Sequence, residues 1–341
     1  MSIDAAKPVQ QTPLVAADDL TRHFHPGRRR SGRVVHAVDG VSLSIERGET
    51  LGLVGESGSG KSTLARLLLH LEKPTAGQVV FDGQDVFASS AGELRQLRRK
   101  MQIVFQDPFA SLNRRQTVEQ IISFPLIVHD RSLSRQDRRR RVSDLLELVG
   151  LRQEHAAAYP RQLSGGQCQR VSIARALALN PSFIVLDEAV SAVDVSIQAQ
   201  ILNLLRDLQE RLGLTYLFVT HDLAVVRYMA TTIAVMYRGR IVELAPTSVL
   251  FDAPRHPYTH ALLSAVPPPP GAPAPPPVVL NEAETTDVLP SGCRFHPRCP
   301  LGTRSICQTV DPPVQEMAHG HHVACHFPQS AESLLSEAGQ Q

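Results

Sequence analysis

The sequence predicts an α/β fold with a largely parallel sheet, and three apolar segments carry the prediction. Residues 50–54 form an apolar strand that runs into a glycine-rich loop, residues 183–186 form a second strand that ends in an acidic pair, and residues 215–220 form a third that ends at His221. Helical patterns separate these segments. Strands that alternate with helices form a largely parallel sheet.

The chain before the first of these strands is predicted to be β-rich. Residues 1–13 are polar and are expected to form a disordered leader. From Leu14 the sequence has short β-rich segments, and residues 41–45 alternate apolar and polar side chains as a half-buried strand does.

A helix is predicted behind the glycine-rich loop. Its apolar residues recur at i, i+3, i+4 and i+7, and this stripe is expected to face the sheet; they are Leu64, Leu67, Leu68 and Leu71.

The loop itself, Gly55 to Ser62, matches the phosphate-loop pattern G-x-x-x-x-G-K-[ST] in full. The strand before it and the helix behind it are the context that such a loop needs. Backbone N–H groups of Gly58 to Ser62, together with the positive end of the helix, are expected to bind phosphate oxygens. Lys61 would neutralise charge on the β- and γ-phosphates, and the Ser62 hydroxyl would ligate Mg²⁺.

The acidic pair after the second strand predicts the rest of a nucleotide-hydrolysing site. Asp187 is expected to hold the same Mg²⁺ from the other side. Glu188 is the candidate base that polarises the attacking water.

The middle of the chain, about 88–180, is predicted to be a mainly helical subdomain. Val142, Leu145, Leu146 and Val149 form a helical stripe that Gly150 should stop as a C-terminal cap. Residues 197–212 have the apolar spacing of a long helix.

Composition is that of a soluble globular protein. The 341 residues include 43% apolar and 20% charged residues and carry a net charge of +2, which does not point to nucleic acid or an anionic membrane. The start lacks the apolar stretch of a secretory signal, and no window reaches the ~18 apolar residues of a membrane span. A cytoplasmic location with reduced cysteines follows, so the five cysteines indicate metal binding or chemistry before disulfides.

A proline-rich segment marks a predicted boundary. Residues 267–277 contain eight prolines, which as polyproline II would make a semi-rigid spacer of roughly 34 Å. The extension beyond it, 278–341, holds four cysteines whose spacing selects neither zinc nor an iron–sulfur cluster. They are Cys293, Cys299, Cys307 and Cys325, and a zinc site could add His296, His321 or His326.

The run Leu163-Ser164-Gly165-Gly166-Gln167 lies between the phosphate loop and the acidic strand. In this order the three elements resemble the ATP-binding cassette (ABC) family. The resemblance implies a P-loop ABC ATPase domain over 14–266, with a mixed sheet core, a β-rich subdomain and a helical subdomain, followed by a small Cys-rich C-terminal extension. In that family the glycine-rich run caps the γ-phosphate of ATP held by another cassette.

The resemblance also assigns further roles. Gln106 would touch Mg²⁺ and the water, His221 would contact the γ-phosphate, and Phe24, or alternatively His25, would stack on adenine. The catalytic set is then Glu188, His221, Gln106 and Lys61. The nucleotide-binding set is Phe24, Gly55, Glu56, Ser57, Gly58, Ser59, Gly60, Lys61, Ser62, Thr63, Gln106, Asp187, the signature residues Ser164, Gly165, Gly166 and Gln167, and Asp194 at the dimer interface, with Mg²⁺ held by Ser62, Gln106 and Asp187.

Some positions depart from the family pattern. Cys168 follows the signature where Gln or Arg is common, and Arg114, Ala189 and Val193 replace a proline, a proline and a leucine. None of these changes removes a charge or a hydroxyl from the reaction path, so competent hydrolysis is expected.

Three stretches narrow the resemblance to the ATPases of dipeptide and oligopeptide importers, closest to the second of their two ATPase subunits: residues 35–42, residues 254–267 and residues 292–300. This implies a second cassette subunit in a heterodimer, two membrane permeases and an extracytoplasmic peptide-binding protein, at the cytoplasmic face of the inner membrane. It also implies a [4Fe–4S] cluster on the four tail cysteines, with zinc as the alternative. Glutathione or nickel are alternative solutes.

Two other classes of protein fit the sequence less well than a peptide-importer ATPase. Cassette ATPases that act on nucleic acid carry two cassettes or a long coiled coil, whereas only about a hundred residues without heptads separate loop and signature here. A metal-binding module with a dead cassette is disfavoured by the intact Lys61, Asp187, Glu188 and His221.

Overall fold

The computed structural model describes residues 12–25, 34–191, 193–265, 280–281, 289–302, 304–318 and 320–328. The expected leader lies outside these residues except for its last two, and the proline-rich segment lies outside them entirely. Within the described ranges, none of the helices combines the length and the apolar character needed to cross a bilayer.

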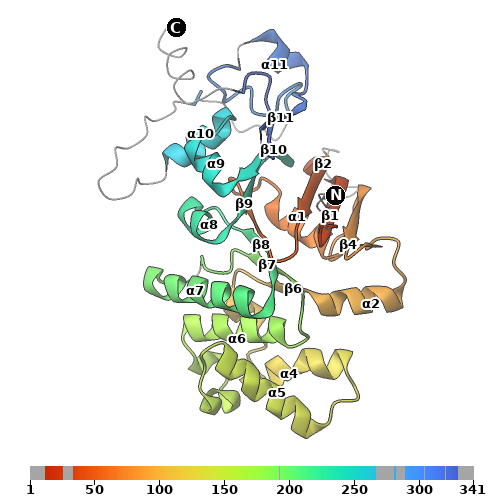
Figure 1. Ribbon diagram of the computed structural model, residues 1–341, viewed down its shortest axis with the longest axis vertical. Coiled ribbons are helices and arrows are strands. Elements are labelled where there is room, and N and C mark those ends of the chain that lie inside the picture. Colours follow the sequence, from red (N-terminus) through yellow and green to blue (C-terminus); the bar gives the residue numbers. More distant parts are fainter. Residues whose placement is uncertain are drawn as a thin grey trace, which may run out of the picture.

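The central sheet has eight strands in the order β11-β12-β10-β9-β3-β8-β7-β6 among the described residues, and it runs through the middle of the molecule (Figure 1). The five strands from β9 to β6 are parallel, as the alternation of strands and helices predicts. Every residue of β3, β7 and β8 is buried, which is typical of parallel strands covered on both faces. The strands are β3 (Thr50–Val54), β6 (Met101–Val104), β7 (Phe183–Asp187), β8 (Thr215–Val219), β9 (Thr232–Tyr237), β10 (Arg240–Pro246), β11 (Val314–Ala318) and β12 (His321–Ala324).

A second, antiparallel sheet confirms the β-rich start of the chain. Its order is β2-β1-β4-β5, and residues 41–45 alternate between buried and exposed as predicted. Its apolar residues share a core with helix α1 and one face of the central sheet. The strands are β1 (Val15–Phe24), β2 (Val35–Ile45), β4 (Ala76–Phe81) and β5 (Gln84–Asp85).

Helix α1 (Lys61–Leu68) forms behind the glycine-rich loop, but it is shorter than the leucine stripe predicted. Leu64, Leu67 and Leu68 are fully buried. The backbone then turns through His70, which has a φ of +50°, so Leu71 leaves the helix and is 50% exposed. The prediction that Leu71 faces the sheet is therefore wrong.

The middle of the chain is mainly helical, yet part of it belongs to the central sheet. Strand β6 lies within the predicted helical stretch and pairs in parallel with β7. Val142, Leu145 and Leu146 are buried on α5, which Gly150 follows with a φ of +70°. Helices α4 to α6 form the end of the molecule farthest from the C-terminal region (Figure 1). The elements are α2 (Ala91–Lys100), α3 (Pro108–Ser111), α4 (Val118–His129), α5 (Arg135–Leu148), the 3₁₀ turns η1 (Gln153–Ala157) and η2 (Pro160–Gln162), α6 (Gly165–Leu177) and α7 (Val195–Leu212).

The residues beyond the proline-rich segment pack directly on the preceding domain. Strand β12 pairs antiparallel with β10, through Glu243 opposite Val323, and thereby extends the central sheet. Phe295, Cys299 and Leu301 join the core of that sheet. Helix α11 (Ser305–Thr309) belongs to this part, whereas α8 (Leu223–Met229), α9 (Thr247–Asp252) and α10 (Pro257–Ser264) precede the proline-rich segment.

A buried hydrogen-bonded pair, Glu243 and His321, joins β10 to β12. Glu243 is fully buried, and its carboxylate lies 2.7 Å from Nε2 of His321, which is 3% exposed. The same carboxylate accepts hydrogen bonds from the backbone N–H groups of Arg255 and His256, at 2.7 and 2.9 Å. Burial alone would raise the pKa of Glu243, but the hydrogen bonds, with His321 first, outweigh it and lower the pKa.

Removing one partner of this pair should be costly. We expect His321→Ala to lower the free energy of unfolding by about 3 kcal/mol, because it leaves the Glu243 carboxylate buried without its side-chain partner. Denaturant unfolding of the full chain measures the change. His322→Ala, one residue along the same strand, is the matched control because His322 is only half-buried.

The pH dependence gives a second readout of the same pair. A carboxyl whose pKa is lowered on folding stabilises the protein above its unfolded pKa of about 4.3 and loses that contribution as the pH falls. The difference between wild type and His321→Ala should therefore hold near neutral pH and shrink below about pH 4. Equal stability of the two proteins at pH 7 would show that the pair is not what anchors β12.

Candidate nucleotide site

The glycine-rich loop connects β3 to α1 and can only be built with glycine at two points. Gly55 has a φ of +151°, and a Cβ there would lie 2.1 Å from the carbonyl oxygen of Met236. Gly60 has a φ of +108°, and a Cβ there would lie 2.0 Å from the carbonyl oxygen of Ala37. Both neighbours are backbone atoms that cannot move aside, so the pattern glycines set the loop's path.

The start of α1 is open toward the loop. Its N-cap is Gly60 in the left-handed conformation, which offers no side chain to cap the helix. Leu64 N–H bonds to the Gly60 carbonyl at 2.9 Å, so the first N–H groups of the helix remain available. Those groups and the helix dipole favour a bound anion.

Lys61 lies along the loop. Its side chain is 6% exposed, and Nζ donates to the carbonyl oxygens of Gly55 and Glu56, at 2.7 and 2.9 Å. Burial lowers the pKa of Lys61, while the carboxylates of Glu188, Asp187 and Glu56 act in the opposite direction.

Ser62 and Asp187, the two expected Mg²⁺ ligands on α1 and β7, lie within hydrogen-bond distance of each other. The Ser62 hydroxyl donates to Asp187 Oδ1 at 3.0 Å, which brings a hydroxyl from α1 to the carboxyl end of β7. Burial raises the pKa of Asp187, and the Ser62 hydrogen bond opposes that rise. Two adjacent oxygen ligands of this kind fit Mg²⁺.

Glu188 lies between two of the predicted catalytic residues. Gln106 Nε2 donates to Glu188 Oε2 at 2.6 Å, and His221 Nδ1 lies 3.3 Å from Glu188 Oε1. The backbone of Glu188 has a φ of +48°, an uncommon conformation for a side chain of this size. Its N–H bonds to the Val219 carbonyl of the neighbouring strand at 2.9 Å, which holds it there.

These groups border an open cavity of about 370 Å³. The loop, the start of α1, the Gln106–Glu188 pair and residues 35–37 of β2 all contribute to its lining. Phe24 is not among the lining residues; it is 36% exposed and lies opposite Val35, which is one of them. The lining comprises Val35, His36, Ala37, Ser57, Gly58, Gly60, Lys61, Ser62, Thr63, Gln106 and Glu188.

The signature run lies apart from this cavity, and none of its residues is in the lining. Ser164 is the N-cap of α6 and forms a capping box with Gln167. A Cβ on Gly166 would lie 2.5 Å from Cγ2 of Ile197, so α6 and α7 pack closely here. Asp194 is the N-cap of α7.

Cys168, the departure next to the signature, has a structural explanation. It is fully buried in α6, and its thiol donates to the Pro160 carbonyl at 3.4 Å. Burial raises the pKa of Cys168 to about 11. The side chain is therefore a small core residue with an unreactive thiol.

The four tail cysteines are free thiols; three are buried and Cys293 is half-buried. Burial first, and then the neighbouring thiols, raises the pKa of Cys299 and Cys325 to about 12. Among the described residues, no three of these sulfurs lie within 4.8 Å of one another. The four thiols thus share one region without the tight grouping of a single-ion site.

The one such grouping in the described part of the chain is His23, His36 and Asp39. Asp39 bonds to His23 Nε2 at 2.7 Å and also pairs with Arg294 and Arg240. Burial would raise the pKa of Asp39, but the His23 hydrogen bond and the Arg294 charge lower it to about 2. Two guanidinium groups on the carboxylate favour an ion-pair network over a cation site.

Two residues that the sequence analysis did not place at the site contact the loop. Tyr258 Oη accepts the backbone N–H of Glu56 at 2.8 Å, and Arg298 Nη1 donates to the Glu56 carboxylate at 2.9 and 3.1 Å. Both belong to stretches on which the resemblance to peptide-importer ATPases rests, residues 254–259 and 292–300. The stretches were visible in the sequence, but their contact with the loop was not.

Two family descriptions match the chain. The family described as "ABC transporter" matches residues 38–191, and the one described as "Oligopeptide/dipeptide transporter, C-terminal region" matches residues 242–307.

Named relatives cover nearly the whole chain. A probable peptide ABC transporter ATP-binding protein, y4tS, of Sinorhizobium fredii is 51% identical, over 92% of this chain and 89% of its own length. The oligopeptide transport ATP-binding protein AppF of Bacillus subtilis is 50% identical, over 86% of this chain and 90% of its own length.

Solved structures match the cassette part. A dimeric post-hydrolysis state of the ATP-binding cassette MJ0796 with ADP and phosphate superposes with a TM-score of 0.62 at 35% identity, over 68% of this chain and 98% of that one. The cassette cbiO1 of Clostridium perfringens has the same TM-score at 29% identity, over 71% and 92%.

Proposed function

The chain belongs to the ABC transporter family, in the group of peptide-transport ATP-binding proteins, and from that premise we propose that it hydrolyses ATP to power uptake of dipeptides or oligopeptides across the cytoplasmic membrane. The observation that carries the hydrolytic part is the arrangement of Glu188 between Gln106 and His221, beside the Ser62–Asp187 pair. The two relatives named above support peptide as the solute.

In this proposal, different residues of the chain bind the phosphates and the Mg²⁺ ion. Backbone N–H groups of the loop and of α1 bind the phosphates, and the Lys61 ammonium exchanges its loop carbonyls for phosphate oxygens. When bound, Mg²⁺ would neutralise phosphate charge, held by Ser62, Gln106 and Asp187.

Glu188 is the general base. Its carboxylate accepts a proton from the water as the water oxygen attacks the γ-phosphorus and the bond to the bridging oxygen breaks. Gln106 fixes one carboxylate oxygen by its 2.6 Å hydrogen bond, which keeps the base aimed into the cavity. His221 is 3.3 Å from the other oxygen and contacts the γ-phosphate.

The signature run serves a second cassette. Ser164 to Gln167 lie outside the lining of this chain's own cavity, so they are free to complete a site on a partner. Asp194 begins α7, and its neighbour Val193 lies close to the run, with Cγ1 3.9 Å from the position of a Cβ on Gly165. Phe24 stacks on adenine at the rim, next to Val35.

The proposed assembly is the one that the resemblance to peptide importers implies. The partner cassette is a different ATPase subunit, and the pair binds two permeases that receive peptide from an extracytoplasmic binding protein. The chain lies at the cytoplasmic face of the inner membrane. ATP closes the two cassettes and hydrolysis reopens them, a population shift that alternates the permeases.

The tail cysteines hold a [4Fe–4S] cluster in this proposal. Sulfurs around one zinc at about 2.3 Å would lie roughly 3.8 Å apart, closer than any three of these sulfurs, which do not gather within 4.8 Å. A cluster binds each sulfur to a different iron, so its ligands are farther apart. Three buried thiols and the half-buried Cys293 act on one another electrostatically, which fits that larger group.

Replacing the base tests the hydrolytic proposal. Glu188→Gln should lower the ATPase rate of the assembled transporter by at least about 100-fold, because the amide cannot accept the proton. ATP binding should persist, and cells with this change should stop importing a labelled peptide. Glu154→Gln, an exposed carboxylate on η1, is the control. An unchanged rate in Glu188→Gln would refute the role of Glu188.

A mixed complex tests the role of the signature. Lys61→Ala inactivates the phosphate loop of this chain, so the remaining ATPase activity comes from ATP bound at the partner's phosphate loop. Adding Ser164→Ala should lower it by at least about tenfold, as the loss of one phosphate-directed donor does. Ser134→Ala removes an equivalent N-cap from α5 and is the matched control. If both variants behave alike, the signature does not act on the partner.

Anaerobic purification tests the cluster. The full chain should be coloured, absorb visible light and contain about four irons, and Cys299→Ser should lose both colour and iron. Cys168→Ser should keep them, because Cys168 is buried in α6 beside Pro160. A colourless protein that contains stoichiometric zinc would refute the iron–sulfur cluster in favour of a zinc site. A protein without any metal would refute both the cluster and the zinc site.

A further inference from the structure

Two parts of the C-terminal region converge on one residue of the phosphate loop. Tyr258 holds the backbone of Glu56, and Arg298 holds its carboxylate. We infer that Tyr258 and Arg298 are positioning residues for the phosphate loop, so that the region following β10 completes the ATP site. The inference rests on the proposed function only in taking ATP as the ligand of this loop.

The side chain of Tyr258 is held in place by contacts other than its hydrogen bond with the loop. It is fully buried, and its ring packs against Tyr237 and Phe295 with centroid separations of 4.7 and 5.4 Å. It lies in the first turn of α10, whose N-cap His256 is anchored by a 2.9 Å hydrogen bond from its N–H to the buried Glu243. The Tyr258 hydroxyl therefore presents a rigid acceptor to the loop.

Arg298 reaches the loop from the cysteine-bearing segment. Its own N–H bonds to the Phe295 carbonyl at 3.0 Å, in the turn that ends at Cys299. One guanidinium nitrogen contacts both carboxylate oxygens of Glu56, and the two side chains are 24% and 44% exposed. A half-exposed ion pair of this kind adds little to the free energy of unfolding. Its expected effect is instead to hold the Glu56 side chain in a defined position.

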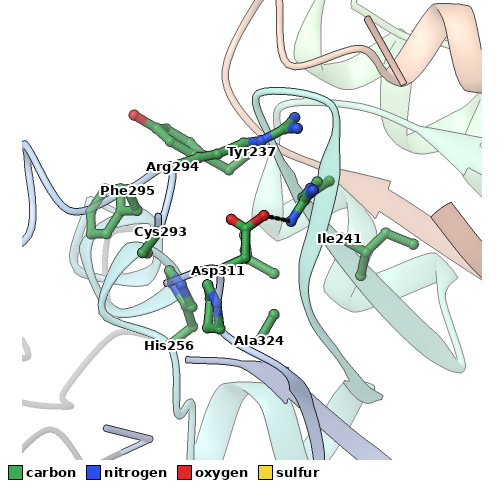
Figure 2. A pocket seen from close by; sticks show the side chains of 11 residues that line it. Tyr237, Ile241, His256, Cys293, Arg294, Phe295, Asp311 and Ala324 are labelled. Carbon is green, nitrogen blue, oxygen red and sulfur yellow. Dashed lines mark ion pairs between the residues drawn. The ribbon is translucent and has the colours of Figure 1, made fainter. Parts of the chain in front are cut away.

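The segment that carries Arg298 is itself anchored to the cassette. Arg294, which is 8% exposed, donates to the Arg238 carbonyl and to the Asp39 carboxylate. A small cavity of about 30 Å³ lies at this junction. Figure 2 shows side chains that line it, Cys293, Arg294 and Phe295 from the tail and Tyr237 and His256 from the cassette. Arg298 is thus set by contacts that do not involve the loop.

Glu56 connects these contacts to the phosphate-binding groups, so a displacement of Glu56 would also displace Lys61 and the loop N–H groups. Its carbonyl accepts Lys61 Nζ at 2.9 Å and the Ser59 N–H at 3.2 Å. Glycine is conformationally permissive, so the flanking Gly55 and Gly58 allow the loop's path but do not by themselves hold Glu56 in it. Releasing Glu56 would therefore let the Lys61 ammonium and the loop N–H groups leave the geometry that phosphate requires.

Binding of ATP to the full chain tests the inference, with a fluorescent ATP analogue as probe. Tyr258→Phe keeps the ring and removes only the acceptor, and it should weaken binding by about threefold to tenfold. Arg298→Ala should weaken it by about threefold to fivefold. Arg298→Lys should recover part of the loss at low salt. The thermal midpoint measured without nucleotide should match the controls.

The matched controls remove similar groups elsewhere. Tyr228→Phe loses the hydrogen bond from Tyr228 Oη to Asn203, and Arg152→Ala loses an exposed ion pair with Glu154. Neither should change the affinity for the probe.

A double-mutant cycle decides whether Arg298 acts through Glu56. Glu56→Gln should weaken binding as Arg298→Ala does, and the double variant should be no weaker than either single one. The effect of Arg298→Ala should shrink from about 0.05 M to about 0.5 M salt, since the pair is partly exposed. Additive losses, or wild-type affinity in Tyr258→Phe and Arg298→Ala, would overturn the inference. Absence of binding by the wild type would instead refute the ATP site itself.

Discussion

Parallel pairing of β3, β8, β7 and β6 is the constraint on which the site depends. Parallel strands end at the same edge of a sheet, and four functional segments begin there: the phosphate loop after Val54, Gln106 after β6, Glu188 after β7 and His221 after β8. Residues more than a hundred positions apart in the sequence come within hydrogen-bond distance for this reason, as Ser62 and Asp187 do. A change in strand order would separate them without altering a single side chain.

The C-terminal region adds a second constraint at the opposite side of β3. The Glu243 carboxylate is hydrogen-bonded to His321 of β12 and to two backbone N–H groups just before α10. One buried carboxylate therefore fixes both the added strand and the helix that carries Tyr258. A buried charge needs all its partners to be tolerated. The same group therefore ties the extension to the sheet and supports the contacts with Glu56.

Much of this could be predicted because the signals were local. A strand, a glycine pattern and a helix are contiguous, and Asp187-Glu188 directly follow an apolar run. Leu71 was mispredicted because its spacing continues a stripe whose backbone has already turned at His70. The contacts of Tyr258 and Arg298 with Glu56 join residues 202 and 242 positions apart in the chain, and periodicity contains no information on such pairs. The place of Cys168 likewise needed the packing around α6.

The pairing of β10 with β12 also orders events during synthesis. Glu243 and Val323 are neighbours in the sheet but are 80 residues apart in the chain. At about 5–20 residues per second, a ribosome would need roughly 4–16 s to deliver the partner strand after β10 has been made. During that interval the edge of β10 that later pairs with β12 is open, and the Glu243 carboxylate has the N–H groups of Arg255 and His256 but not His321 as partners. A charge at an open sheet edge hinders other strands from docking there.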